Sequence, residues 1–199
     1  DVDRLGIPRF AGHDYLDPTT IEAISRFRSS VGHDYHDDAE SCRSMKHYFR
    51  ARSASDWAAI PIYAPVTGTI ARTRTEFLGT QIVVTSAAQP AFRFTLFHVV
   101  TTTGVDSGAA VTAGQVLGHH VGNQTMTDIA VSVDTPTGYR LLSWFEVMTD
   151  SVFATYSARG VAARSSMVIS KAERDADPLM CAGEAFTTAG TLESWVALP

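Results

Sequence analysis

The residues that decide the fold are Pro61-Ile62-Tyr63-Ala64-Pro65-Val66-Thr67-Gly68-Thr69-Ile70, in which two short apolar runs are joined through prolines and a glycine. Ile, Val and Thr are enriched in strands, whereas Pro and Gly mark turns. Further runs of this kind follow at 81–85, 92–100 and 128–133, again separated by turn residues. Short runs at roughly 8–12-residue spacing predict a mainly β domain built from antiparallel strands.

The composition is that of an ordinary folded domain of 199 residues. Its 16 basic and 21 acidic residues leave a net charge of −5, which argues against a general nucleic-acid binder. No run of ~18 apolar residues is present, so we expect no membrane span. The chain opens at Asp1-Val2-Asp3 without a charged and then apolar leader, so we expect that an exported form has already lost its signal.

A helical pattern precedes the β-rich region. Asp17 can cap a helix that begins at Pro18, because a carboxylate accepts the free N–H groups of the first turn and proline fits the first helical position. Ile21 and Ile24 would then share one helical face. We therefore expect an N-terminal helical extension over 1–30.

Two further helices are expected after the β-rich region. One covers about 149–159, with Gly160 just beyond its end, where glycine often adopts the left-handed conformation. The other opens at the capping box Ser170-Lys171-Ala172-Glu173. The chain is thus divided into the N-terminal extension, a β-domain over 31–148, and a C-terminal helical extension over 149–199 that packs on it.

Cys42 and Cys181 are the only two cysteines, and the sequence leaves two interpretations of them open. They are either two buried thiols or one disulfide that ties the C-terminal tail to the segment after His33. A bond across so long a loop would stabilise the fold by ~4–5 kcal/mol in the chain-entropy model and would indicate an oxidising compartment. Two thiolates alone cannot complete a tetrahedral metal site.

Four segments, in order, resemble the LytM/lysostaphin-type zinc metallopeptidases. Gly32-His33-Asp34-Tyr35 is similar to that family's first metal-binding motif, and 61–70 looks like its hairpin rich in Pro and Gly. Leu96-Phe97-His98 stands where the family has Tyr-x-His, and 105–118 matches its late glycine turn. The resemblance spans about 30–134 and implies an antiparallel β-sheet or sandwich of LytM type with flanking N- and C-terminal helices.

The set of zinc ligands that the resemblance implies is incomplete. The family holds zinc with a His and an Asp of the first motif and with the second His of a late His-x-His. Here the late motif falls on Asp128-Ile129-Ala130, so a methyl group stands at the third ligand position. The first motif fits in two registers, one placing Ser30 at the ligand His and one pairing His33 with Asp37, and neither register is complete. A catalytic zinc needs three protein ligands.

We expect no metal and no other cofactor, and instead acid–base chemistry in a zinc-free cleft. The candidate catalytic residues are His33, Asp34, His98 and Asp128, because a carboxylate beside an imidazole fixes its tautomer and suits a general base. His98 alternates with apolar residues and so fits a core position too, but the resemblance implies that it lines the cleft. A rebuilt metal site with His33, Asp34 and Asp128 as zinc ligands is the alternative.

The polar segment 33–48 supplies the candidate substrate-binding residues Tyr35, Arg43, Lys46, His47 and Tyr48. Arg and Lys neutralise carboxylates, while Tyr and His exchange protons. This combination suits β-elimination in an acidic polysaccharide, in which a carboxylate is neutralised, a proton is removed and the leaving oxygen is protonated. A solvated, charge-rich loop is the alternative interpretation of the same residues.

Three functions remain open at this point. The first is a secreted or periplasmic enzyme, a lyase or hydrolase, that acts on an extracellular or cell-wall polymer. The second is a non-catalytic module that binds glycan or peptidoglycan or regulates a partner. The third is a metallopeptidase with altered ligands. A polymeric substrate or glycan is the expected partner, and neither nucleic acid nor a membrane span is expected.

Overall fold

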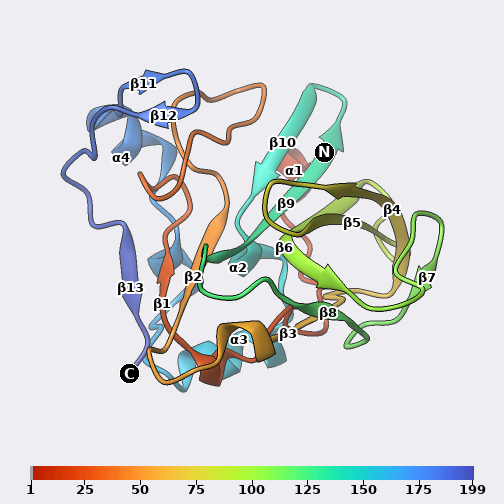
Figure 1. Cartoon of the computed structure of the whole chain (residues 1–199). Coiled ribbons are helices and arrows are strands. Elements are labelled where there is room, and N and C mark those ends of the chain that lie inside the picture. Colours follow the sequence, from red (N-terminus) through yellow and green to blue (C-terminus); the bar gives the residue numbers. More distant parts are fainter. Residues whose placement is uncertain (1) are drawn as a thin grey trace.

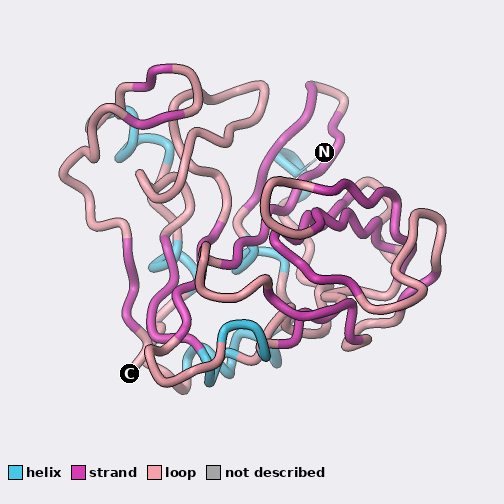
Figure 2. The backbone as a smooth tube through the Cα atoms, viewed as in Figure 1, coloured by secondary structure: helices cyan, strands magenta, loops and turns pink. Residues whose placement is uncertain are grey.

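The computed structural model describes residues 2–199, except for the side chain of Asp3. Strands and loops make up most of the chain, and the helices are short (Figure 2). None of the helices in the described residues is long and apolar enough to cross a bilayer. The helices are α1 (Val2–Leu5), α2 (Trp144–Val147), α3 (Asp150–Ser157) and α4 (Lys171–Ala176), with 3-10 turns η1 (Pro18–Thr20), η2 (Trp57–Ala59) and η3 (Arg164–Met167).

The strands are β1 (Ile21–Ser25), β2 (His47–Ala51), β3 (Pro61–Tyr63), β4 (Gly68–Thr75), β5 (Thr80–Ser86), β6 (Phe92–Thr101), β7 (Ala110–Val111), β8 (Val116–His120), β9 (Thr127–Thr135), β10 (Gly138–Leu142), β11 (Cys181–Ala182), β12 (Ala185–Phe186) and β13 (Trp195–Ala197).

Within residues 2–199, an 11-stranded sheet forms with antiparallel neighbours throughout. Its main path runs β13-β1-β2-β9-β6-β5-β4-β7, while β10 pairs with β9, and β8 pairs with both β3 and β6. β11 and β12 form a separate hairpin. Figure 1 shows β1, β2 and β13 together at one end of the sheet and β4, β5 and β7 at the other. The predicted mainly β fold of antiparallel strands is confirmed.

Strand β9 lies in the middle of the sheet and separates two packed layers. Its residues Ile129, Val131 and Val133 belong to the large apolar core. Ala130 points to the opposite face and joins a small cluster formed by Phe27, Met45, Phe97 and Leu141. Successive side chains of a strand alternate between faces, so Asp128 shares the face of Ala130. This alternation places a carboxylate beside the small cluster.

The expectation of a helix that begins at Pro18 is wrong. At this position only the turn η1 forms, capped by Asp17 as expected, and strand β1 follows directly. The four-residue helix α1 lies before this turn. β1 lies between β2 and β13 and is buried over most of its length. A short apolar run covered on both faces favours a strand, and the β-branched Ile21 and Ile24 pack well on a pleated surface.

Both helices expected after the β-rich region are confirmed. α3 begins after its N-cap Thr149, and Gly160 beyond it has a φ of 89°. α4 begins after Ser170, which forms the predicted capping box with Glu173. Strand β13 then returns to the sheet beside β1, so both ends of the chain contribute to one edge. The division of the chain at residues 30 and 148 stays a prediction.

Candidate functional site

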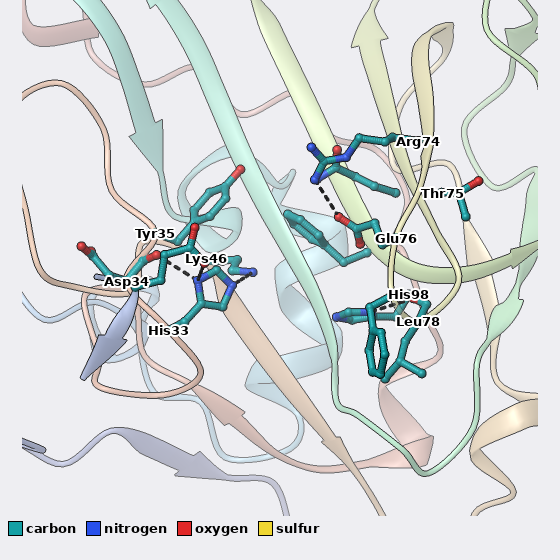
Figure 3. Close-up of a pocket in the computed structure, with 13 residues that line it drawn as sticks. His33, Asp34, Tyr35, Lys46, Arg74, Thr75, Glu76, Leu78 and His98 are labelled. Carbon is teal, nitrogen blue, oxygen red and sulfur yellow. Dashed lines mark hydrogen bonds and ion pairs between the residues drawn. The ribbon is translucent and has the colours of Figure 1, made fainter. Parts of the chain in front are cut away.

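A cavity of about 590 Å³ opens between the loop before β2 and the hairpin that joins β4 to β5. Figure 3 shows His33 and Asp34 on one side of it and Arg74, Glu76 and His98 on the other. Basic, acidic and aromatic side chains therefore meet in one space. The lining residues are His33, Asp34, Tyr35, Lys46, Arg74, Thr75, Glu76, Phe77, Leu78, Gln81, Phe97, His98 and Glu184.

Lys46 lines the cavity and forms an ion pair with Asp128, and the two side chains are 2 % and 0 % exposed. Nζ of Lys46 donates to Oδ2 of Asp128 at 2.6 Å and lies 3.2 Å from Nε2 of His33. Lys46 directly precedes β2, and β2 pairs with β9 so that Tyr48 lies opposite Asp128. The register of these two strands thus brings the two charges together. Removing one partner of a buried pair typically costs ~3–5 kcal/mol.

Three aromatic rings surround the same ammonium. The ring centroids of Phe97, Tyr35 and Tyr48 lie 4.1, 4.7 and 5.0 Å from Nζ of Lys46. Aromatic faces attract cations, so the rings add to the attraction of the carboxylate. Burial raises the pKa of both tyrosines, so their hydroxyls keep their protons. Tyr48 packs against Gly32, whose φ is +76° and where a Cβ would overlap the tyrosine hydroxyl.

His98 approaches the buried pair from strand β6. Its φ of 60° is unusual for a residue other than glycine, and the register of β5 and β6 shifts beside it. The shift turns the imidazole out of the apolar row of β6 and into the cavity. Its Nδ1 lies 3.0 Å from the carbonyl oxygen of Leu78, and its Nε2 lies 3.4 Å from Oδ1 of Asp128. Because each nitrogen faces an oxygen atom, the ring is oriented so that an N–H on either side points at an acceptor.

His33 has the opposite arrangement. Its Nδ1 lies 2.9 Å from the carbonyl oxygen of Asp34, which can only accept a hydrogen bond. Its Nε2 faces the ammonium of Lys46, which can only donate. These two contacts favour the tautomer with the proton on Nδ1 and the lone pair on Nε2. The site thus combines a proton acceptor at His33 with a proton donor at His98.

Comparison with known proteins gives matches of structure alone, since no family model and no curated protein matches this chain. A structure of the SpoIIQ–SpoIIIAH pore-forming complex matches with a TM-score of 0.50 and 13 % identity, over 75 % of this chain and 98 % of that chain. This protein has the LytM-type fold. The M23 metalloprotease pseudoalterin from the deep sea matches 69 % of this chain and 73 % of its own at 14 % identity, but its TM-score of 0.39 is too low to support a conclusion.

The side chains at the centre of this LytM-type fold do not fit a zinc ion. Ala130 is buried at the position that the resemblance implies for the third ligand, and its methyl group cannot coordinate. The ammonium of Lys46 lies between Asp128 and His33, where it repels a second cation. Among the described side chains, no group of three or more His, Cys, Asp or Glu is placed to hold a metal ion.

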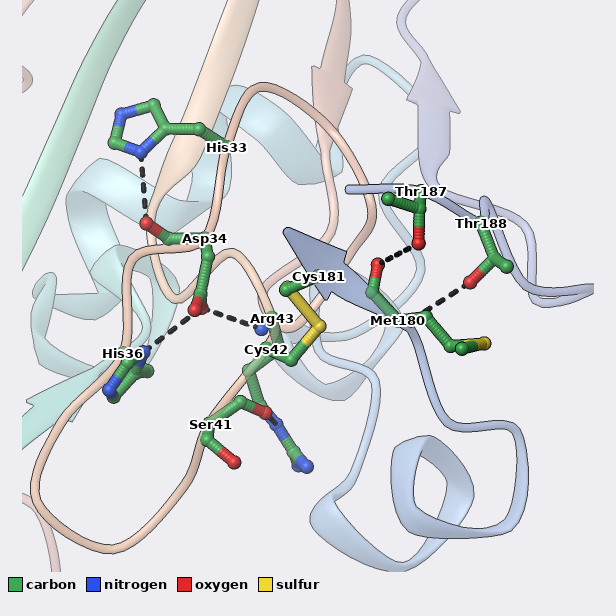
Figure 4. Close-up of a disulfide and its surroundings, with 10 residues drawn as sticks. All are labelled: His33, Asp34, His36, Ser41, Cys42, Arg43, Met180, Cys181, Thr187 and Thr188. Carbon is green, nitrogen blue, oxygen red and sulfur yellow. Dashed lines mark hydrogen bonds and ion pairs between the residues drawn. A yellow bond between two sulfur atoms is a disulfide. The ribbon is translucent and has the colours of Figure 1, made fainter. Parts of the chain in front are cut away.

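Asp34 lines the cavity, but its carboxylate takes no part in the Lys46 cluster. Oδ1 accepts a hydrogen bond from the backbone N–H of Arg43 at 2.9 Å and lies 3.0 Å from Nδ1 of His36 (Figure 4). These contacts fix the loop that carries His33. The structure therefore gives Asp34 a role in holding the loop, and it brings together the other three predicted catalytic residues, His33, His98 and Asp128.

The expectation that Arg43 contacts substrate does not fit its position. Its guanidinium is mostly buried and pairs with Glu40 at 2.6 Å and with Asp175 at 2.9 Å. Glu40 also pairs with Arg28, and these cations lower the pKa of its carboxyl despite its burial. Arg43 therefore ties the loop to helix α4 and does not line the cavity.

The expectation that His47 contacts substrate is wrong for a different reason. Adjacent residues of a strand point to opposite faces, so Lys46 and His47 cannot both reach the cavity. His47 is buried, with Nδ1 2.7 Å from the carbonyl oxygen of Ser25 and Nε2 2.8 Å from Oγ of Ser143. Burial lowers the pKa of His47 to about 4, so it stays neutral.

The sequence reasoning missed the β4–β5 hairpin, which forms one wall of the cavity. Arg74 donates to Glu76 at 3.2 Å, and both line the cavity. Phe77 is 98 % exposed at the tip of the same hairpin. A large apolar residue in a charged turn is the signal that marks this hairpin, because isolated turns normally carry polar residues.

Cys42 and Cys181 form a disulfide, so that interpretation of the two cysteines is confirmed. The bond joins the loop before β2 to β11 across a sequence separation of 139 (Figure 4). It holds the β11–β12 hairpin, where Glu184 lines the cavity. The backbone carbonyl oxygen of Glu184 accepts a hydrogen bond from the backbone N–H of Asp34 at 2.7 Å. The C-terminal tail therefore supplies one wall of the site.

Proposed function

We propose that the protein binds an acidic polysaccharide in this cavity and cleaves it by acid–base chemistry without a metal ion. The observation that supports this is the arrangement of two imidazoles on either side of the Lys46–Asp128 pair. His33 offers a lone pair and His98 offers an N–H. These are the two proton-transfer groups that an elimination reaction needs.

In the proposed β-elimination, Nε2 of His33 takes the proton from the carbon beside the uronate carboxylate. The electron pair of that C–H bond forms a C=C bond, and the glycosidic C–O bond on the neighbouring carbon breaks. His98 gives a proton to the departing oxygen, which balances the proton taken by His33. The guanidinium of Arg74, largely exposed at the cavity wall, neutralises the uronate carboxylate.

Lys46 and Asp128 act as positioning residues in this scheme. The ammonium faces Nε2 of His33 and so keeps the ring proton on Nδ1. The carboxylate lies 3.4 Å from Nε2 of His98 and helps to orient that ring. Both proton-transfer groups are thereby held in place before substrate binds.

Phe77 supports a polymeric substrate. Its ring is 98 % exposed beside the cavity, where it can stack on a sugar ring. Stacking of this kind contributes ~0.5–1.5 kcal/mol beyond the buried area. Phe77→Ala is therefore expected to weaken glycan binding by ~2–10-fold.

The test is incubation with a panel of acidic polysaccharides, followed by ultraviolet absorbance of unsaturated uronate ends. His33→Ala and His98→Ala are each expected to lower the rate by ~100-fold or more, since general acid–base groups contribute ~10²–10⁴-fold. His119→Ala is the matched control, because His119 is an exposed histidine of β8 outside the cavity. Equal rates for His98→Ala and the unchanged protein would refute the assigned chemistry.

Glycan binding without cleavage is the second candidate, and the exposed ring of Phe77 favours it. Calorimetric titration with the same polysaccharides separates the two. Binding that Phe77→Ala weakens, with no unsaturated product from any polymer, would establish the binding function. Cleavage that both histidine variants abolish would establish the enzyme.

A secreted or periplasmic location belongs to the same proposal, because disulfides form and persist in oxidising compartments. Alkylation of protein taken directly from the producing cells, followed by mass measurement, reads the state of Cys42 and Cys181. An exported protein is expected to carry no alkylated cysteine. Two alkylated cysteines in the bulk of the protein would contradict the location.

A further inference from the structure

The loop that carries His33 is held by a segment from the far end of the chain. This segment, termed the tail hairpin, consists of β11, β12 and the turn between them, residues 181–186. It contacts the loop through the Cys42–Cys181 disulfide and through the backbone carbonyl oxygen of Glu184. Both contacts lie on the side of the cavity that presents His33 (Figure 4).

Asp34 transmits the contact with the tail hairpin to His33. Its backbone N–H donates to the carbonyl oxygen of Glu184 at 2.7 Å, and its own carbonyl oxygen lies 2.9 Å from Nδ1 of His33. A carbonyl oxygen can only accept a hydrogen bond, so it favours a proton on Nδ1 and leaves the lone pair on Nε2. The side chain of His33 is 41 % exposed, so packing alone does not fix its ring. The position of the Asp34 backbone therefore decides how the imidazole is oriented.

The tail hairpin depends on the disulfide for its place. Each of its strands has two residues, and residues 182–185 are exposed. A two-stranded hairpin of this kind is only marginally stable in water. Cys42 directly precedes Arg43, whose backbone N–H donates to Oδ1 of Asp34 at 2.9 Å. The bond to Cys181 therefore keeps the hairpin at a high effective concentration beside the backbone of Asp34.

The backbone of Glu184 holds the loop more firmly than its carboxylate does. Oε2 of Glu184 lies 3.7 Å from Nδ1 of His33, beyond hydrogen-bonding distance, and this side chain is 85 % exposed. Exposed ion pairs are weak and are screened by salt. The backbone bond to Asp34, at 2.7 Å, is a direct and directional contact.

We propose that the tail hairpin is a positioning element of the site. The carbonyl oxygen of Glu184 holds the Asp34 backbone, and the Asp34 backbone holds the His33 ring in the state that accepts a proton. Glu184 is thus a positioning residue that acts through Asp34. This inference rests on the proposed function, because it names what prepares the proton acceptor of that reaction.

Gly183→Val displaces the turn of the hairpin and leaves the disulfide in place. Gly183 has a φ of +61°, which a β-branched residue strongly disfavours, and a Cβ there would meet no atom within 4 Å. The strain is therefore confined to the turn that presents the carbonyl oxygen of Glu184. Gly104→Val is the matched control, because Gly104 has a φ of +85°, also faces open space and lies in a turn outside the cavity.

Two measurements by NMR follow the site without any substrate. Hydrogen exchange of the Asp34 amide reports its bond to Glu184, and the imidazole ¹⁵N shifts of His33 report which nitrogen carries the proton. Gly183→Val is expected to exchange the Asp34 amide ~10-fold faster or more, because an amide exchanges when its hydrogen bond opens. The variant is also expected to show a mixture of His33 tautomers, and Gly104→Val is expected to match the unchanged protein. Equal exchange in the two variants, or one unchanged His33 tautomer despite faster exchange, would overturn the proposal.

Turnover of an acidic polysaccharide gives the third measurement. Gly183→Val is expected to lower kcat by ~10-fold or more with a smaller change in KM, because a misplaced proton acceptor slows the chemical step while the rest of the cavity still binds polymer. An unchanged kcat despite faster exchange would contradict the positioning role. If the unchanged protein cleaves no polymer, the proposed enzyme fails, and the exchange rate and the ¹⁵N shifts alone decide whether the tail hairpin positions His33.

Removal of the disulfide tests how the hairpin is held. Because loss of a native disulfide can abolish folding, Gly183→Val, which keeps the bond, carries the main test by itself. Cys42→Ser combined with Cys181→Ser is examined where circular dichroism shows it to be folded, and it is expected to exchange the Asp34 amide at least as fast as Gly183→Val. Exchange as slow as in the unchanged protein would show that the hairpin needs no covalent bond to stay beside Asp34, and would overturn this part of the proposal.

Discussion

The two faces of strand β9 are packed in opposite ways. On one face, Ile129 and Val131 lie in a large core of apolar side chains. On the other, Asp128 pairs with Lys46 among three aromatic rings. Apolar burial has no preferred direction and tolerates small changes of shape, whereas a buried charge needs one specific partner in one place. The difference shows that stability is spread over one face, while the candidate chemistry is concentrated in a few atoms of the other.

Removal of the charge on the polar face is expected to have the largest effect. Asp128→Ala leaves the ammonium of Lys46 buried without its carboxylate, which typically lowers the free energy of unfolding by ~3–5 kcal/mol. Urea unfolding followed by circular dichroism measures the loss. The same variant is expected to lose activity as well, because His98 loses the oxygen that faces its Nε2.

A second variant tests whether the stability loss of Asp128→Ala comes from breaking its ion pair with Lys46 and not from the smaller side chain. Combining Asp128→Ala with Lys46→Met removes both charges, and the double variant is expected to be more stable than Asp128→Ala alone. A double-mutant cycle gives the coupling between the two residues. Strictly additive losses would mean that the two charges do not stabilise each other.

Asp14 is a half-buried residue whose carboxyl group provides an internal comparison for Asp128. It accepts the backbone N–H of Tyr15 at 2.9 Å but has no cation as a partner among the described residues. Burial accordingly raises the pKa of Asp14 from 3.8 to about 7. A raised pKa means that the folded protein holds this proton more tightly than the unfolded chain. The resulting stabilisation is complete below about pH 4 and is lost as the pH rises to about 7.

We therefore expect that Asp14→Asn becomes more stable relative to the unchanged protein as the pH rises, because asparagine carries no charge at any pH. Relative to this variant, the unchanged protein is expected to lose up to about 4 kcal/mol of stability between about pH 4 and pH 8. Urea unfolding of both proteins at several pH values measures the difference. A constant difference across this range would mean that Asp14 titrates alike in the folded and unfolded states.

The apolar face of β9 follows from local sequence, and the polar face does not. The alternation of Ile129, Val131 and Val133 predicts a strand with one buried face, as observed. The apolar residues Ile21 and Ile24 led to the wrong prediction of a helix, whereas they lie in strand β1. A short apolar run fits either a helix or a buried strand, and only the segments that pack against it decide between them.

The candidate site depends on residues far apart in the sequence. Lys46 reaches Asp128 only because β2 pairs with β9, and Glu184 reaches the cavity only because Cys181 bonds to Cys42. A pattern within one short segment predicts neither this strand pairing nor this disulfide. The resemblance to LytM-type proteins identified His33, His98 and Asp128 by position, but no family motif marked the lysine between them. Its role follows from distances alone.

A change on the apolar face is expected to have the smallest effect. Ile129→Val removes one buried methylene next to Asp128 in the chain, at a typical cost of ~0.5–1.5 kcal/mol. Urea unfolding measures this loss, and the polysaccharide assay is expected to be unchanged, because the substituted side chain points away from the cavity. A loss as large as that of Asp128→Ala, or a fall in activity without a fall in stability, would mean that the two faces of β9 are coupled. Two small changes one residue apart thus measure how far the packing of the core is separated from the chemistry of the cavity.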